Sequence, residues 1–165
     1  MPDLDALDLA LITALRDNPR AGALALSRIT RVARATVESR LGRLERAGVV
    51  TGYGPDIDMT AAGFTVLAFV TLEIAQGALG QVTADLAAIP AVLEAYAITG
   101  SADVVCKVAA TSHADLQQTL LSIDSSPSVA RSTSAIVLST VIAPRDLPLL
   151  VSREPTAIPR SPAFR

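Results

Sequence analysis

The sequence predicts an α+β fold built in two parts. Within residues 1–53, apolar side chains recur at the three- and four-residue spacing of amphipathic helices, and turn formers separate three such segments. Over residues 64–143 the pattern changes to β-branched, strand-length runs that alternate with helical ones. Residues 54–63 carry Gly, Pro and Asp and predict a linker between the two domains.

The first domain is expected to be a winged-type helix-turn-helix head. Asp5 and Asp8 have the spacing of a capping box, so a helix starts there, and Pro19 requires it to end before Asn18. Gly48 is placed to end the third helix. The expected later elements are helices over about 23–30 and 34–47 and a short strand over 49–53.

The second domain is expected to have the ferredoxin-like β-α-β-β-α-β arrangement. Its expected strands are residues 66–74, 92–99, 104–110 and 135–142, with helices over about 79–89 and from Ser112 through Ile123. Two helices cover one face of such a sheet and leave the other face bare. A second subunit is the expected cover for that bare face, because monomers rarely expose large apolar patches.

Composition limits the class of protein. Half of the residues are hydrophobic and 18% are charged, which again favours surface buried between subunits. The single cysteine, Cys106, suits a reducing compartment, no apolar run is long enough to span a membrane, and the acidic start is unlike a signal peptide. We therefore expect a cytoplasmic protein. Residues 144–165 hold five of the ten prolines and are expected to form an extended or disordered tail.

Charge is distributed unevenly along the chain. Between Arg20 and Arg46 there are seven Arg and two acidic residues, whereas from Asp56 onward ten acidic residues face six basic ones. The third helix combines an apolar stripe with a neighbouring stripe of Arg and hydroxyl residues, which suits a recognition helix in a major groove. The predicted DNA-binding residues are Arg28, Arg34, Thr36, Ser39, Arg40, Arg43 and Arg46. The plainer alternative is a solvated charged face.

Two patterns in this head resemble a known family. They are Leu4-Asp5-x-x-Asp8 and Val37-x-x-Arg40-Leu41-x-Arg43-Leu44-Glu45-x-x-Gly48-Val49-Val50-x-x-Tyr53. Both are similar to the head of the Lrp/AsnC (leucine-responsive, feast/famine) transcriptional regulators. The resemblance extends over about residues 4–142 and includes Gly100-x-x-Asp103 and the segment Arg131-Ser132-Thr133-Ser134. It departs at the turn before the third helix, where Arg31-Val32-Ala33 replaces the usual Gly-Leu-Ser.

The resemblance implies a small effector, typically an amino acid, bound between subunits of dimers that often assemble into octamers. An ammonium group suits Asp103, a carboxylate suits nearby hydroxyls, and Gly100 lets the backbone approach a ligand. The predicted effector-binding residues are Thr99, Gly100, Ser101, Asp103, Thr133 and Ser134. The alternative is purely structural, with Gly100 forming a turn that the Asp103 side chain caps.

Catalytic and metal-binding motifs are not found in the sequence. His113 is the single histidine, no Cys/His cluster offers a zinc site, and no phosphate-binding loop or nucleophile elbow is present. We predict no metal, no cofactor and no membrane partner. The leading hypothesis is a sequence-specific DNA-binding regulator, homo-oligomeric and modulated by an amino acid. The alternatives are an oligomeric small-molecule-binding protein whose head has lost specific DNA binding and, more weakly, a small-molecule enzyme.

Overall fold

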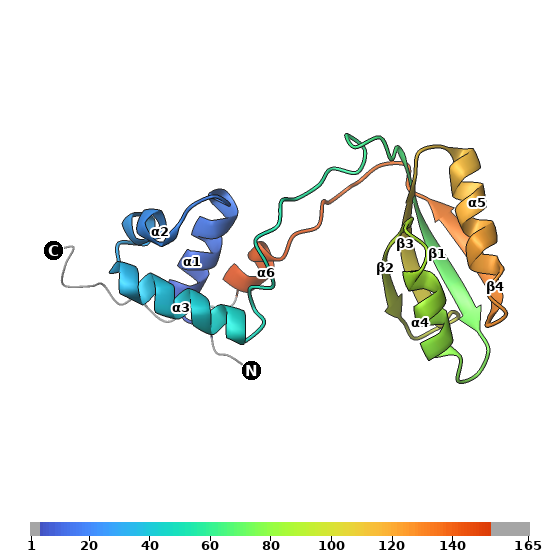
Figure 1. Cartoon of the computed structure of the whole chain (residues 1–165), viewed down its shortest axis with the longest axis horizontal. Coiled ribbons are helices and arrows are strands. Elements are labelled where there is room, and N and C mark those ends of the chain that lie inside the picture. Colours follow the sequence, from blue (N-terminus) through green and yellow to red (C-terminus); the bar gives the residue numbers. More distant parts are fainter. Residues whose placement is uncertain (1–3, 153–165) are drawn as a thin grey trace. The chain divides into compact units, whose positions relative to one another are not determined.

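The computed structural model describes residues 4–152, which form two compact units (Figure 1). The helical unit comprises residues 4–56 together with 143–152, and the sheet unit comprises residues 57–142. The chain therefore leaves the helical unit, forms the sheet unit and returns. The α+β class and the order of the main elements agree with the sequence prediction.

Three helices form the core of the helical unit. They are α1 (Ala6–Asp17), α2 (Ala23–Thr30) and α3 (Arg34–Arg46). The capping box predicted for α1 is present: the Asp5 carboxylate accepts from the amides of Leu7 and Asp8, and the Asp8 carboxylate accepts from the Asp5 amide. Leu7, Leu11, Leu26, Val32 and Val37 bury their side chains together where the three helices meet.

The strand expected over residues 49–53 does not form. Helix α3 ends in a Schellman motif, in which Gly48 has a φ of 68° and its amide donates to the Glu45 carbonyl. The amides of Val49 and Val50 both donate to the Leu44 carbonyl. Because the helix end uses these two amides, they are not available to a sheet ladder, and the prediction of a strand here is wrong.

The sheet unit contains four antiparallel strands in the order β2-β3-β1-β4. They are β1 (Val66–Ile74), β2 (Val92–Ala97), β3 (Val104–Ala110) and β4 (Val129–Ile136). The predicted bounds of β1 and β3 are confirmed, and β2 ends two residues earlier than predicted.

The last strand lies six residues upstream of its predicted position at 135–142. Strand β4 pairs with β1 from Glu73 opposite Arg131 to Ala68 opposite Ile136, so that β1 sets where β4 ends. The apolar residues that led to the prediction of a strand at 135–142 extend beyond the first residue of β1. Among them, Leu138 is 96% exposed. Apolarity misplaced this strand because half of the residues of β4, an edge strand with one open face, are polar.

Helices α4 (Leu79–Ala87) and α5 (His113–Asp124) pack on one face of the sheet (Figure 1). Their buried residues Val82, Leu86, Leu116 and Ile123 meet the alternate strand residues, including Val70 and Val108, that form the core. The opposite face carries Leu67, Phe69, Thr71 and Glu73 of β1 and is open, as predicted.

The predicted tail is partly ordered. Residues Leu147–Val151 form a short helix, α6, in the same unit as α1, and Arg16 contacts Asp146 at 2.5 Å. The expectation of an extended or disordered tail is therefore wrong for residues 147–151. The remainder, residues 153–165, lies outside the described part of the chain.

Arg31 follows α2 and has a φ of 56°, the one positive φ outside glycine in the described chain. This left-handed conformation costs a non-glycine residue about 1–2 kcal/mol.

Replacing Arg31 by Gly removes that cost. Gly also raises the conformational entropy of the unfolded chain, which lowers stability by about 0.4–1 kcal/mol, so we expect a net increase in stability of about 0.5–1 kcal/mol. Hydrogen exchange of the α2 and α3 amides measures this gain. Arg28→Gly, inside α2, should instead destabilise by about 1 kcal/mol, and equal effects of both substitutions would contradict the assignment.

Candidate nucleic-acid interface and effector site

Helix α3 packs into the head through the apolar stripe that the sequence predicted. Val37 and Leu44 are fully buried, and the half-buried Leu41 packs against the same core. Successive residues of an α-helix are rotated by roughly 100°, so the side opposite this stripe faces solvent. Ala35, Ser39, Gly42 and Arg46 lie on that side, and the exposed Arg34 and Glu38 flank it; we call these six residues the outward face of α3.

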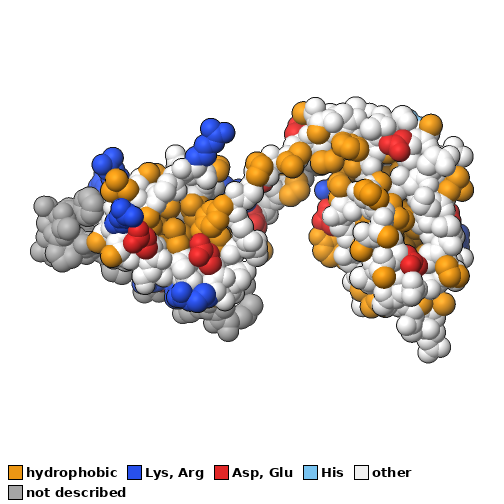
Figure 2. Space-filling model, in the orientation of Figure 1, with side chains coloured by type: hydrophobic (Ala, Val, Ile, Leu, Met, Phe, Trp, Pro, Cys, Tyr) orange, Lys and Arg blue, Asp and Glu red, His pale blue; other side chains and the backbone are white. Residues whose placement is uncertain are grey.

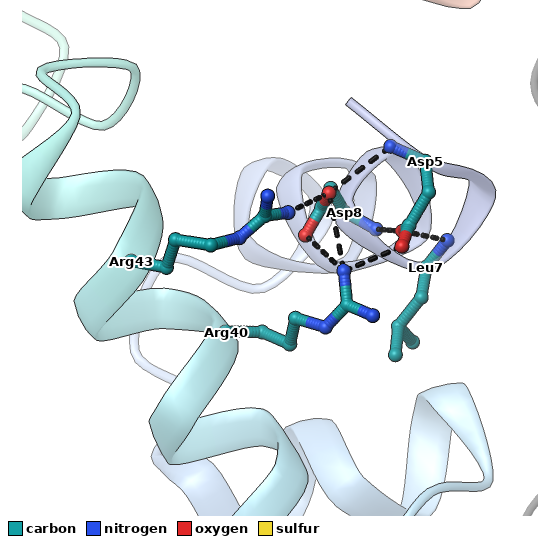
Figure 3. A network of polar contacts seen from close by, with 5 residues as sticks. All are labelled: Asp5, Leu7, Asp8, Arg40 and Arg43. Carbon is teal, nitrogen blue, oxygen red and sulfur yellow. Dashed lines mark hydrogen bonds and ion pairs between the residues drawn. The ribbon is translucent and has the colours of Figure 1, made fainter. Parts of the chain in front are cut away.

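Arg40 and Arg43 do not belong to the outward face. Figure 3 shows both side chains extending from α3 towards Asp5 and Asp8 at the start of α1. Arg40 Nη1 donates to Asp5 Oδ2 at 2.5 Å and lies 3.3 Å from Asp8 Oδ1, while Arg43 Nη2 donates to Asp8 Oδ2. The Asp8 side chain is fully buried, so two guanidinium groups compensate one carboxylate removed from water.

The same contacts influence the Asp5 carboxyl group. Burial raises the pKa of Asp5. Hydrogen bonds from the Asp8 amide and from Arg40 lower this pKa by more than burial raises it, so that it lies below the ordinary 3.8. A carboxyl group whose pKa is lowered on folding stabilises the native state above its unfolded pKa. This contribution is lost as the pH falls through the lowered value. The contacts of the Asp5 carboxylate therefore stabilise the head at neutral pH.

The sequence pattern did not predict that the guanidinium groups of Arg40 and Arg43 are engaged by carboxylates of the protein itself. The pattern placed them on a polar stripe of α3, but it did not show that α1 places two carboxylates against that stripe. Thr36 is half-buried beside them. Of the other predicted DNA-binding residues, Arg28, Arg34, Ser39 and Arg46 are exposed.

Cationic side chains remain concentrated on the helical unit. In Figure 2 the visible Lys and Arg side chains gather there, while the visible face of the sheet unit is mostly apolar or uncharged. Arg28 and Arg31 are exposed close to the N-terminal end of α3, and Arg46 lies at its C-terminal end. This placement suits contacts with phosphates on either side of a groove.

A hollow of about 310 Å³ lies on the open face of the sheet unit, where β1 and β4 meet the β2–β3 turn. Its lining residues are Thr71, Glu73, Ser101, Ala102, Arg131 and Thr133. Glu73 and Arg131 face each other across the strands at 3.9 Å, and both are about half or more exposed. The hollow thus combines one cation, one anion and three hydroxyl groups.

The structure brings only part of the predicted effector set together. Ser101 and Thr133 line the hollow, whereas Ser134 pairs with Val70 and lies towards the helix-covered face. Thr99 and Gly100 lie in the β2–β3 turn, and Gly100 has a φ of 124°, a conformation that favours glycine.

Asp103 has a structural partner. Its Oδ2 accepts from the Ile74 amide at 2.8 Å, and its own amide donates to the Leu72 carbonyl at 2.9 Å. These bonds hold the β2–β3 turn against the end of β1 and so place Ser101 beside Glu73. The Asp103 carboxylate thus has a structural role, but it bonds β1 and does not cap the turn at Gly100, as the structural alternative had expected.

Sequence reasoning missed Thr71, Glu73 and Arg131 as members of this hollow. Arg131 had been noted only as the first residue of the Arg-Ser-Thr-Ser segment, and β4 was expected to begin at residue 135. A strand placed six residues too late cannot pair Arg131 with Glu73. The missing signal was the register of β4 on β1, which depends on contacts distant in sequence.

Other chemistry is sparse within residues 4–152. No group of three or more His, Cys, Asp or Glu side chains is placed there to hold a metal ion. Cys106 is buried in β3, and burial raises its pKa to about 11, which keeps the thiol protonated and unreactive. Every helix in this part of the chain is too short or too polar to cross a bilayer.

A helix-turn-helix unit joined to this four-stranded α+β domain defines a class: DNA-binding transcriptional regulators with a ligand-binding domain. Residues 4–51 match the family model described as winged helix-turn-helix DNA-binding, and residues 67–147 match the Lrp/AsnC ligand binding domain. The chain belongs to the Lrp/AsnC family of transcriptional regulators.

Similar proteins agree with this assignment. The HTH-type transcriptional regulator FL11 of Pyrococcus horikoshii is 32% identical over 88% of this chain and 97% of its own length. AsnC of E. coli superimposes with a TM-score of 0.83 at 26% identity, over 89% of this chain and all of that one. Regulator NMB0573 of Neisseria meningitidis, solved as a complex with L-Met, has a similar fold, with a TM-score of 0.79 at 24% identity over 86% of this chain and 94% of its own.

The buried carboxylate of Asp8 is expected to be essential to the head. Asp8→Asn keeps the shape but removes the charge that two guanidinium groups contact, so the helical unit should lose about 2–3 kcal/mol of stability. Hydrogen exchange of the α1 and α3 amides measures this loss. Asp17→Asn, at the exposed end of α1, should change stability by less than about 0.5 kcal/mol. Equal, small effects of the two substitutions would show that the network is dispensable.

Proposed function

We propose that this protein is a cytoplasmic regulator that binds a specific DNA sequence and whose affinity for it changes when an amino acid binds. The observation that carries the effector part of the proposal is the hollow between β1 and β4. An α-amino acid at neutral pH has a carboxylate and an ammonium group a few ångströms apart. Arg131 and Glu73 supply one partner for each, and the surrounding hydroxyls supply hydrogen bonds.

The DNA part of the proposal rests on the head. Its solvent-facing side includes the outward face of α3 and exposed Arg residues near both ends of that helix. We assign phosphate contacts to Arg28, Arg31 and Arg46, and base contacts to the N-terminal half of the outward face, the part of a recognition helix that enters a major groove. Arg40 and Arg43 contribute indirectly, because they hold α3 against α1.

The open face of the sheet supports the expected homo-oligomer, which is a dimer or a further assembly of dimers into an octamer. Phe69 is 44% exposed at the centre of this face, and it lies between Lys107 on β3 and Ala135 on β4. Tyr96 on β2 is 57% exposed on the same side. A four-stranded sheet that leaves aromatic side chains in water gains stability when a second copy covers them.

The alternative function, a small-molecule-binding oligomer without specific DNA binding, draws on two features of the head. Arg31 occupies a left-handed turn, and Ala33 caps α3 without a side-chain hydrogen bond. Both weaken the turn before the recognition helix by about 1 kcal/mol each. The affinity for specific DNA relative to random DNA distinguishes the two functions.

The protein should bind the DNA upstream of its own gene about a thousandfold more tightly than random DNA of equal length, the usual margin of specific recognition. A gel shift at fixed salt measures this ratio.

A thermal-shift screen of the twenty amino acids, L-methionine first, should identify a ligand that raises the melting temperature and changes the operator affinity. Arg131→Gln should abolish that response without changing the affinity of the ligand-free protein for the operator.

Arg145→Gln is the matched control, because this substitution removes the same charge at an exposed position that does not line the hollow. A wild-type protein that binds both DNAs equally would favour the alternative function. An amino-acid response that survives Arg131→Gln would move the effector site elsewhere.

Phe69→Glu should dissociate the oligomer, because a carboxylate at the centre of a covered sheet face is buried without a partner. Sedimentation of the full chain should show a mass per particle that falls towards the monomer. Leu24→Glu tests an apolar residue of similar exposure in the head and should leave the mass unchanged. If the Phe69 variant keeps the wild-type mass, the open face is not the interface.

A further inference from the structure

We propose that Glu38 reads a cytosine base in the major groove and that Arg34 holds its carboxylate in position for this contact. The inference rests on the proposed specific DNA binding and names the residue that supplies part of the specificity. Glu38 is exposed in the N-terminal half of the outward face of α3, rotated by about 100° from the buried Val37. Half of its side chain is exposed.

The displacement of Arg40 and Arg43 makes Glu38 prominent. With those two guanidinium groups held at Asp5 and Asp8, they no longer dominate the DNA-facing side of α3. The neighbours of Glu38 on the outward face, Ala35, Ser39 and Gly42, have short side chains or none. Arg34 and Glu38 are therefore the long side chains that extend from the N-terminal half of this face.

A carboxylate on a surface that approaches a phosphate backbone is unfavourable unless it has a specific partner. The major groove exposes two amino donors, on cytosine and on adenine. The adenine amino group lies beside N7, an acceptor that repels a carboxylate, so Glu and Asp accept preferentially from cytosine. The favourable interaction for the Glu38 carboxylate in the major groove is therefore a hydrogen bond from the cytosine amino group of a C·G pair. It also disfavours binding elsewhere, because it repels phosphates wherever no cytosine amino group is available.

Arg34 orients this carboxylate. Its Nε donates to Glu38 Oε1 at 2.7 Å, which leaves Oε2 and the two Nη groups of Arg34 for the duplex. The pair adds little to helix stability, since both side chains are at least half exposed and an Arg that precedes Glu by four residues is the weaker order of such a pair. Positioning Glu38 for a base is the role that remains.

Selection from a randomised duplex library with the wild-type protein supplies a preferred sequence. The dissociation constants of wild type, Glu38→Ala and Glu38→Gln are then measured on that duplex, on versions with each C·G pair replaced, and on a scrambled duplex. Wild type should discriminate against the loss of one C·G pair by about tenfold or more. Glu38→Ala should lose this discrimination at that pair alone and bind the scrambled duplex several-fold more tightly, because a charge facing phosphates has gone.

Asp17→Asn is the matched control, because it removes one negative charge from an exposed position at the end of α1 and should keep the wild-type discrimination. A Glu38→Ala variant that keeps discrimination at every C·G pair overturns the inference. A variant that loses affinity equally for the selected and scrambled duplexes also overturns it, since that result indicates a structural role. A wild-type protein that does not distinguish the two duplexes overturns the proposed function as well.

Discussion

The helical unit depends on one buried charge. Asp8 caps α1, lies fully out of water and is compensated by Arg40 and Arg43 of α3. An uncompensated carboxylate at this position would be costly, so the position and rotation of α3 on α1 are tied to these ion pairs as well as to apolar packing. The direction in which α3 faces solvent follows from this constraint.

That rotation separates two kinds of arginine in the head. Arg40 and Arg43 form ion pairs within the head, whereas Arg28, Arg34 and Arg46 are exposed to solvent. The helix thus presents to DNA a surface with fewer cations than its composition suggests. Discrimination between sequences then depends more on a few placed side chains than on overall charge, which supplies affinity without sequence information.

In the sheet unit the corresponding constraint is strand register. Antiparallel pairing of β4 on β1 places Arg131 opposite Glu73 and Thr133 opposite Thr71. The Asp103 bonds hold the β2–β3 turn beside them. Three segments distant in the sequence thereby form one hollow with both charges of an amino acid represented. The open face around it carries the exposed aromatic side chains of Phe69 and Tyr96.

The sequence alone determined the local features of this protein. The capping box of α1, the end of α3 at Gly48 and the bounds of β1 and β3 depend on neighbours within a few residues, and the pattern of side chains records them. The tertiary structure alone decided which polar face of α3 meets solvent, where β4 lies and which residues form the hollow. These depend on partners far away in the chain, such as Asp8 for Arg43, and periodicity carries no information about a partner on another element.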